Sequence, residues 1–193
     1  KYQQIVSEIL LQRTKAETVA KYYDTFFSKF PDWNALANAS LEELEEIMKP
    51  LGLYRHRARR LYKLGEDIRR RGGRIPGNEN ELRDSGFIGL YVTNAFELFI
   101  LRNRKPLLDV NMSRLLKRYF KPGDFIDVRH DKEIQELAND IIEVRRCKEL
   151  NWAILDYAAL VCKTRNPLCG ECVLNKHCKY YELSQGDVTE ESE

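Results

Sequence analysis

The chain has 193 residues, of which 43% are hydrophobic and 32% are charged, and its formal net charge at pH 7 is +2. This is the balance of a globular protein that is long enough for one large domain or two small ones, and it excludes a charge-dominated disordered chain. No apolar run approaches the length that a bilayer requires and no signal-peptide pattern opens the chain, so neither a helical membrane protein nor a secreted chain is expected.

The first part of the chain is helical by pattern. Apolar residues recur at helical spacing within the first ten residues and again up to Pro31, which ends the second helix. Ser40, with Glu43 three residues later, is a capping-box signature for a short helix that ends near Pro50. Because Lys1 already lies within a helical pattern, we expect the natural chain to begin upstream of it.

The next expected helix runs from about Tyr54 to Arg70 and ends at Gly72–Gly73. Its surroundings are strongly basic, with Arg55, His56, Arg57, Arg59, Arg60, Lys63, Arg69, Arg70, Arg71 and Arg74 in one stretch. Acidic residues gather elsewhere, between residues 42 and 46 and in the tail after residue 186. Two interpretations remain open, namely a face that binds a polyanion and an ordinary solvated helix face.

Helical patterns continue as far as residue 161. The expected elements are a helix that begins near Asn78, a glycine-rich break at residues 85–89, a helix from Tyr91 to about Leu101, and helices around residues 112–120, 132–144 and 149–161. Asp109 stands where the N-cap of the helix at 112–120 belongs. No alternating segment predicts a strand, so the predicted fold class is all-α. The polar tail, residues 183–193, is expected to be disordered.

Four of the five cysteines lie close together near the end of the chain, with the spacing Cys162-x6-Cys169-x2-Cys172-x5-Cys178. Four thiolates can hold either a tetrahedral zinc ion or an iron–sulfur cluster. Structural zinc sites usually have two short Cys-x-x-Cys pairs and only one is present, so the spacing favours iron–sulfur over zinc. Cys147 lies outside the pattern and is expected to be a buried thiol.

This cysteine pattern resembles the C-terminal cluster of the endonuclease III superfamily of helix-hairpin-helix DNA glycosylases. The resemblance implies a structural [4Fe–4S] cluster on the four clustered cysteines. It also implies that the loop between the first two ligands meets DNA phosphates, and here that loop carries Lys163 and Arg165. A zinc protein of the same shape remains the alternative.

The middle of the chain resembles the hairpin of the same family. Family members read roughly L-P-G-V-G-x-[KY]-T and then, after a helix, [VL]-D-x-[NH]; this chain has S-G-F-I-G-L-Y-V at residues 85–92 and L-D-V-N at residues 108–111. The resemblance implies that Phe87, Ile88 and Gly89 present backbone N–H groups to a phosphate. Phe87 stands where the first hairpin glycine belongs, so either the turn is shifted by one residue or the grip is weaker.

The resemblance also assigns catalytic residues. It implies that Asp109 is the carboxylate that stabilises the cationic sugar and helps to position water, and the same residue can cap its helix. Tyr91 occupies the position that is lysine in the strand-cleaving members, where the amine forms a Schiff base. Because a phenol cannot do this, we expect a monofunctional enzyme without AP-lyase activity.

The N-terminal segment resembles a third motif of this family. Residues 7–14 read S-E-I-L-L-Q-R-T and are similar to the S-E-[IV]-[ML]-L-Q-Q-T stretch of mismatch glycosylases that excise thymine (Mig type) or adenine (MutY type). The resemblance implies that Glu8 protonates or hydrogen-bonds the departing base, and that Gln12 and Arg13 enter the duplex where a nucleotide has flipped out. Tyr91 and the ending soon after the last cysteine favour thymine or uracil opposite guanine, with adenine opposite guanine or 8-oxoguanine as the alternative.

The resemblance implies a fold of two helical lobes. Residues 14–127 are expected to form a central module with the hairpin, and residues 1–13 and 128–182 to join as an iron–sulfur lobe. We expect a monomer that binds double-stranded DNA containing a mismatch, in the cytoplasm of a prokaryotic cell and associated with its nucleoid. The rival interpretation is a noncatalytic DNA-binding module that keeps the cluster as a scaffold.

Overall fold

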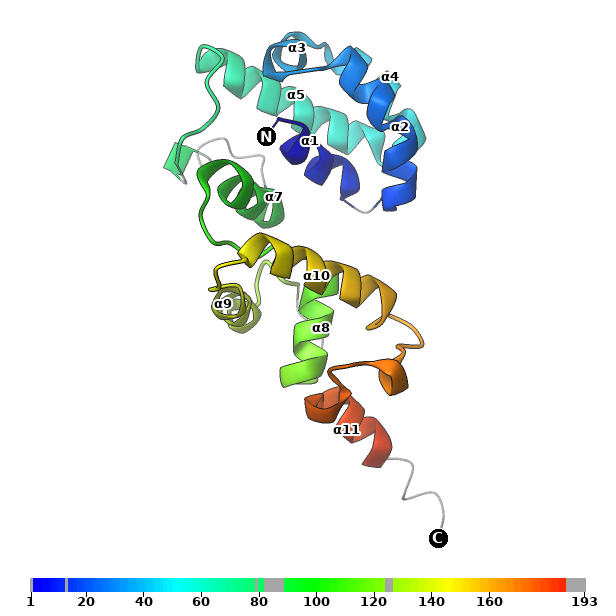
Figure 1. Cartoon of the computed structure of the whole chain (residues 1–193). Helices are drawn as coiled ribbons and strands as arrows, with labels where there is room; N and C mark the ends of the chain where they lie inside the picture. Colours follow the sequence, from blue (N-terminus) through cyan, green and yellow to red (C-terminus); the bar gives the residue numbers. More distant parts are fainter. Residues whose placement is uncertain (1, 13, 79, 82–88, 124–126, 187–193) are drawn as a thin grey trace. The chain divides into compact units, whose positions relative to one another are not determined.

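A computed structural model describes residues 2–12, 14–78, 80–81, 89–123 and 127–186. All regular elements in these ranges are helices (Figure 1), so the prediction of an all-α fold is confirmed. The chain divides into two compact units, Lys1–Asn103 and Arg104–Glu193. None of the helices in the described ranges is long and apolar enough to cross a membrane.

The first unit is a helical bundle around its longest helix. It contains α1 (Tyr2–Leu11), α2 (Ala16–Lys29), α3 (Trp33–Asn38), α4 (Leu41–Met48), α5 (Tyr54–Arg70) and α7 (Leu90–Phe96), with the short 3-10 helix η1 (Lys49–Leu51) and the π-helical segment η2 (Glu97–Leu101). α3 and α4 pack against α5, and α1 packs against α2, α5 and α7. The buried residues of α1 are Tyr2, Ile5, Val6, Ile9 and Leu10, which follow the three-four spacing of one helix face.

Local signals explain where several of these helices begin and end. Ser40 and Glu43 form the predicted capping box, because each side chain accepts a hydrogen bond from the other residue's backbone N–H. Sequence periodicity does not predict α3, whose start is capped by Asp32 through a 2.8 Å bond from the Ala35 N–H. α5 ends at Arg70, and Gly72 follows in the turn with φ +66°, where glycine is favoured.

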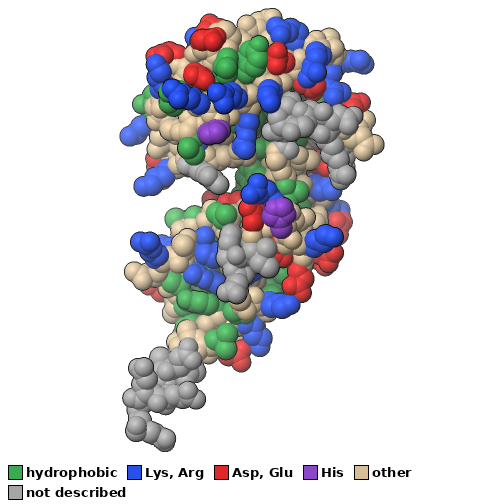
Figure 2. All heavy atoms as spheres, turned by 180° about the vertical axis from the view of Figure 1, so that it is seen from behind, with side chains coloured by type: hydrophobic (Ala, Val, Ile, Leu, Met, Phe, Trp, Pro, Cys, Tyr) green, Lys and Arg blue, Asp and Glu red, His purple; other side chains and the backbone are tan. Residues whose placement is uncertain are grey.

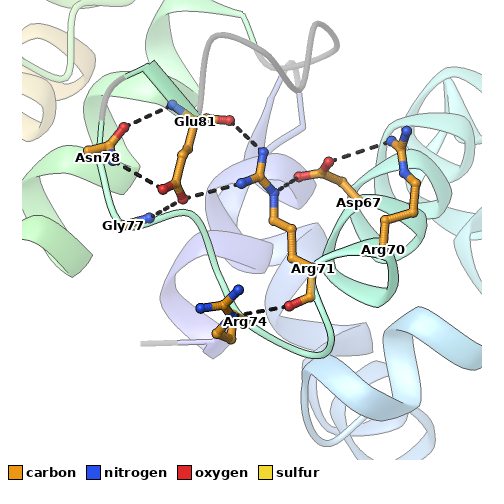
Figure 3. A network of polar contacts seen from close by, with 7 residues as sticks. All are labelled: Asp67, Arg70, Arg71, Arg74, Gly77, Asn78 and Glu81. Carbon is orange, nitrogen blue, oxygen red and sulfur yellow. Dashed lines mark hydrogen bonds and ion pairs between the residues drawn. The ribbon is translucent and has the colours of Figure 1, made fainter.

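A polar network holds the segment that leaves α5 (Figure 3). The Arg71 guanidinium donates to Asp67 Oδ2 at 2.8 Å, to Glu81 Oε2 at 3.2 Å and to the Glu81 carbonyl at 3.1 Å. Glu81 also accepts from the Gly77 N–H and from the Asn78 amide. Asn78 Oδ1 accepts from the Glu81 N–H at 3.0 Å, which is the bond an N-cap makes, at the residue near which the sequence predicts a helix to begin.

The second unit is built around α8. It contains α8 (Val110–Phe120), α9 (Lys132–Ile141), α10 (Cys147–Leu160), the short turns η3 (Cys169–Glu171) and η4 (Asn175–His177), and α11 (Lys179–Gly186). α8 packs against α9, α10 and α11. Its apolar face carries Met112, Leu115 and Leu116, which form a core with Ile134 and Ala158. The short turns shape the segment that carries three of the four clustered cysteines.

The two units do not coincide with the predicted lobes. α1 buries its apolar face against helices of the first unit, and the boundary lies at residue 103 rather than 127. The lobes of residues 14–127 and of 1–13 with 128–182 stay a prediction. The prediction of disorder is wrong for residues 183–186, because they continue α11. The remainder of the tail, residues 187–193, lies outside the described residues.

Candidate functional site

Two of the three predicted catalytic residues meet in the first unit. Glu8 comes from α1 and Tyr91 from the first turn of α7, and these two helices pack against each other. The Tyr91 hydroxyl donates a hydrogen bond to Glu8 Oε2 at 2.6 Å, and both residues are half-buried. Hydrogen bonds to a carboxylate are short and strong, so this contact fixes the direction of both side chains.

Gln12 lies directly after α1 and is held from two sides. Its side-chain oxygen accepts a hydrogen bond from Arg60, and its backbone carbonyl accepts one from Arg57, both on α5. Arg13, its predicted neighbour in DNA entry, lies outside the described residues. Phe87 and Ile88 of the predicted hairpin also lie outside them, whereas Gly89 is exposed at the start of α7.

The exposed side of α5 carries a basic face, which consists of Arg55, His56, Arg59, Arg60 and Lys63. No acidic residue precedes Glu66 on this helix, so neighbouring carboxylates on α5 do not neutralise its first three turns. Figure 2 shows lysine and arginine side chains gathered on the first unit when it is seen from behind. Five residues of the predicted basic stretch therefore lie exposed on one helix.

Asp109 stands at the N-cap of α8, as predicted. Its Oδ1 accepts hydrogen bonds from the backbone N–H groups of Asn111 and Met112, both at 2.8 Å. Its Oδ2 accepts from the Asn111 side-chain amide at 2.8 Å. Leu108 on one side is buried and Val110 on the other is exposed, so the half-buried carboxylate is fixed at a boundary between core and solvent.

The four clustered cysteines of the second unit line one open hollow. Burial is the first cause that raises the pKa of the Cys169 thiol, and the charges of Cys178, Cys162 and Cys172 raise it further. The Tyr157 hydroxyl donates to Cys172 Sγ at 3.2 Å. Among the described residues, no group of three or more histidines, cysteines and acids converges as a site for a single metal ion.

Two arginines of α8 that sequence reasoning missed hold the cysteine segment. Arg114 donates to the Cys162 carbonyl at 2.8 Å, to the Ala158 carbonyl at 2.7 Å and to Asn111 Oδ1 at 3.0 Å. Burial lowers its pKa. Through Asn111, a continuous chain of hydrogen bonds runs from the backbone of a clustered cysteine to Asp109.

Arg118 lies one turn further along α8. It donates to the Lys163 carbonyl at 2.7 Å and to the Thr164 carbonyl at 3.2 Å, and its guanidinium lies 4.7 Å from the centre of the Tyr180 ring. It thereby supports the loop in which Lys163 and Arg165 are exposed. No motif signals either arginine, because their main acceptors are backbone carbonyls, which every residue has.

Comparison with known proteins gives consistent matches over most of the chain. Residues 6–150 match the family described as HhH-GPD superfamily base excision DNA repair protein. A thymine-DNA glycosylase of Aeropyrum pernix is 35% identical over 181 residues, which span 92% of this chain and 81% of that protein. A thymine/uracil-DNA glycosylase of Methanothermobacter thermautotrophicus is 32% identical, with the same coverage of both chains. The solved structure of a thermostable thymine-DNA glycosylase matches with a TM-score of 0.84 and 31% identity, covering 94% of this chain and 84% of that one.

Proposed function

Because the chain belongs to the HhH-GPD superfamily of base excision DNA repair proteins, we propose that it is a monofunctional DNA glycosylase that removes thymine or uracil opposite guanine. The hydrogen bond between Tyr91 and Glu8 carries this proposal. This bond holds the Glu8 carboxyl beside the Tyr91 phenol. Strand-cleaving members of the family have a lysine amine at the position of Tyr91. The names of the similar glycosylases support the choice of base. We propose that the protein acts as a monomer in the prokaryotic cytoplasm, where the nucleoid lies.

The proposed roles follow from the chemistry of each side chain. Asp109 places negative charge beside the sugar as its bond to the base breaks, and it orients the attacking water. Glu8 donates a proton or a hydrogen bond to the departing base, and Tyr91 holds Glu8 in place. Gln12 fills the space that the extruded nucleotide leaves.

The cysteine hollow fits an iron–sulfur cluster by its donor set, because four thiol groups line one space. We propose that Cys162, Cys169, Cys172 and Cys178 hold a [4Fe–4S] cluster, which serves as a structural crosslink. The cysteine segment would then present Lys163 and Arg165 to DNA phosphates, supported from behind by the α8 arginines.

The activity is tested with end-labelled duplexes that contain a single T/G, U/G or A/G mispair, incubated with the protein and then treated with alkali. We expect alkali-dependent cleavage at the thymine of T/G and at the uracil of U/G. Cleavage of A/G alone would identify an adenine glycosylase instead. Cleavage of none of the three would leave a noncatalytic DNA-binding module.

The basic face of α5 is expected to bind duplex phosphates without regard to sequence. Replacing Arg55, Arg59 and Lys63 by Gln should weaken binding equally for matched and mismatched DNA. It should also reduce the slope of log affinity against log salt by up to about 3, because each phosphate contact contributes about 0.9. Fluorescence anisotropy at several salt concentrations measures both effects.

The control for this prediction removes the same charge from exposed lysines elsewhere in the first unit, namely Lys21, Lys29 and Lys49. We expect its salt slope to stay close to that of the original protein. An equal loss of slope in both triple variants would mean that net charge, rather than the basic face, governs binding.

Replacing Tyr91 by Phe removes only the hydroxyl that bonds Glu8. We expect the single-turnover excision rate to fall by up to about tenfold, since a hydrogen bond contributes about 0.5–1.5 kcal/mol net. Tyr62→Phe is the matched control, because this half-buried tyrosine of α5 packs against the core of the same unit. An unchanged rate in Tyr91→Phe would remove Tyr91 from the proposed site.

A further inference from the structure

Arg57 is a buried cation whose partners are all neutral. Arg57 lies in the first turns of α5, and only 3% of the residue's surface is exposed. The guanidinium donates to the carbonyls of Leu51 at 2.8 Å and Gly52 at 2.6 Å, and to the Gln12 carbonyl and the Thr14 hydroxyl. Burial is the first cause that lowers its pKa, and the neighbouring Arg60 lowers it further.

Stability alone does not explain this arrangement. Removing a charge from water is unfavourable, and buried ions are often replaced by apolar side chains without loss of stability. In the part of the chain that the structure describes, Arg57 has no carboxylate partner to offset its desolvation, since its acceptors there are three carbonyls and one hydroxyl. What the guanidinium provides is geometry, because its planar fork bonds several acceptors in fixed directions.

The acceptors come from two separate segments of the chain. Gln12 and Thr14 belong to the turn after α1, whereas Leu51 and Gly52 belong to the turn before α5. A third contact joins the turns directly, because the Thr14 hydroxyl donates to the Leu51 carbonyl at 3.3 Å. The turn that carries Gln12 is therefore locked to the first part of α5, whose exposed side is the basic face.

We propose that Arg57 is a positioning residue for nucleotide extrusion, which holds the Gln12–Thr14 turn fixed relative to the phosphate-binding face of α5. This inference rests on the proposed function. A side chain that is inserted between base pairs must be held rigidly relative to the surface that binds the DNA backbone. In this proposal the basic face binds the backbone phosphates while Gln12 is inserted into the duplex. If the turn that carries Gln12 were flexible, it would move instead of displacing the nucleotide, and phosphate binding would not favour extrusion.

The test compares Arg57→Met and Arg57→Lys with the original protein on two substrates. One is a U/G duplex, and the other carries the same uracil opposite an abasic-site analogue, where stacking is already weakened. On U/G we expect kcat to fall by up to about 10²-fold in Arg57→Met, with little change in KM, because a small displacement of a positioned group has effects of this size. On the weakened pair we expect most of that loss to disappear.

A second readout follows extrusion directly. The fluorescence of 2-aminopurine placed beside the uracil rises when the neighbouring base leaves the stack, and we expect a smaller and slower rise for Arg57→Met. Arg57→Lys keeps the charge but loses the fork, so it should recover only part of the rise. If Arg57→Met does not fold, as judged by circular dichroism, Arg57→Lys carries the same comparison.

Arg69→Met is the matched control, since it removes the same charge from an exposed position of α5, where Arg69 forms an ion pair with Glu66. Equal losses on both substrates, or an unchanged fluorescence rise, would overturn the role of Arg57. Failure of the original protein to excise uracil from either duplex would instead contradict the proposed function, so the two failures are distinguishable.

Discussion

Replacing Asp109 by Asn is expected to reduce the single-turnover excision rate by about 10²–10⁴-fold, since a positioned acid–base or charge-stabilising group contributes effects of this size. The amide is nearly isosteric but carries no negative charge to place beside the developing sugar cation. Asparagine is as good an N-cap as aspartate, so α8 should keep its start. The measurement is release of uracil from a U/G duplex with enzyme in excess.

The control separates catalysis from capping. Asp32 caps α3 through a single bond to the Ala35 N–H, and Asp32→Asn makes the same chemical change at a helix start with no proposed role in catalysis. We expect Asp32→Asn to retain full activity and Asp109→Asn to keep its thermal unfolding temperature. Near-normal excision by Asp109→Asn would leave Asp109 with a capping role alone.

Replacing Cys172 by Ser is expected to have the second large effect, on the integrity of the second unit. Loss of one of four ligands should abolish the bound iron and the visible absorption of a thiolate–iron cluster. Loss of a structural metal group destabilises a protein by on the order of 4 kcal/mol or more. For a chain of this size, that corresponds to a fall in Tm of about 8–16 °C.

Cys147→Ser is the matched control, because Cys147 lies at the start of α10 and does not line the hollow. We expect this variant to keep its iron, its absorption and its Tm. Iron analysis, absorption spectra and thermal unfolding of both variants and the original protein provide the comparison. Retention of iron by Cys172→Ser, or zinc in place of iron in the original protein, would contradict the proposed cluster.

Sequence patterns predicted the parts of this molecule that depend on local chemistry. Helical periodicity and cap residues placed α4, α5 and α8, because a cap acts within three residues of itself. α3 was not predicted because six residues are too few to show a period. The packing of α1 against α2, α5 and α7 has no local signal either, since an apolar stripe does not say which helix will cover it.

The sequence predicted only those residues of the candidate site that belong to a recognisable motif. Glu8 and Tyr91 are separated by 83 positions, and only their resemblance to family motifs suggested a shared role before the hydrogen bond was observed. Arg57 and Arg114 have no comparable signal. Each acts mainly on backbone carbonyls, some of them distant in sequence, and such acceptors leave no trace in the identity of the residues that supply them.

α11 affects how easily oxidants reach the four clustered cysteines. Tyr180 and Tyr181 of this helix line the cysteine hollow, and the stacking of Arg118 on Tyr180 holds the helix there. Sulfur atoms are attacked by oxidants according to their accessibility. The aromatic rings of α11 therefore cover part of the hollow, and we expect removal of the Tyr180 ring to speed the reaction of the clustered thiol groups with peroxide.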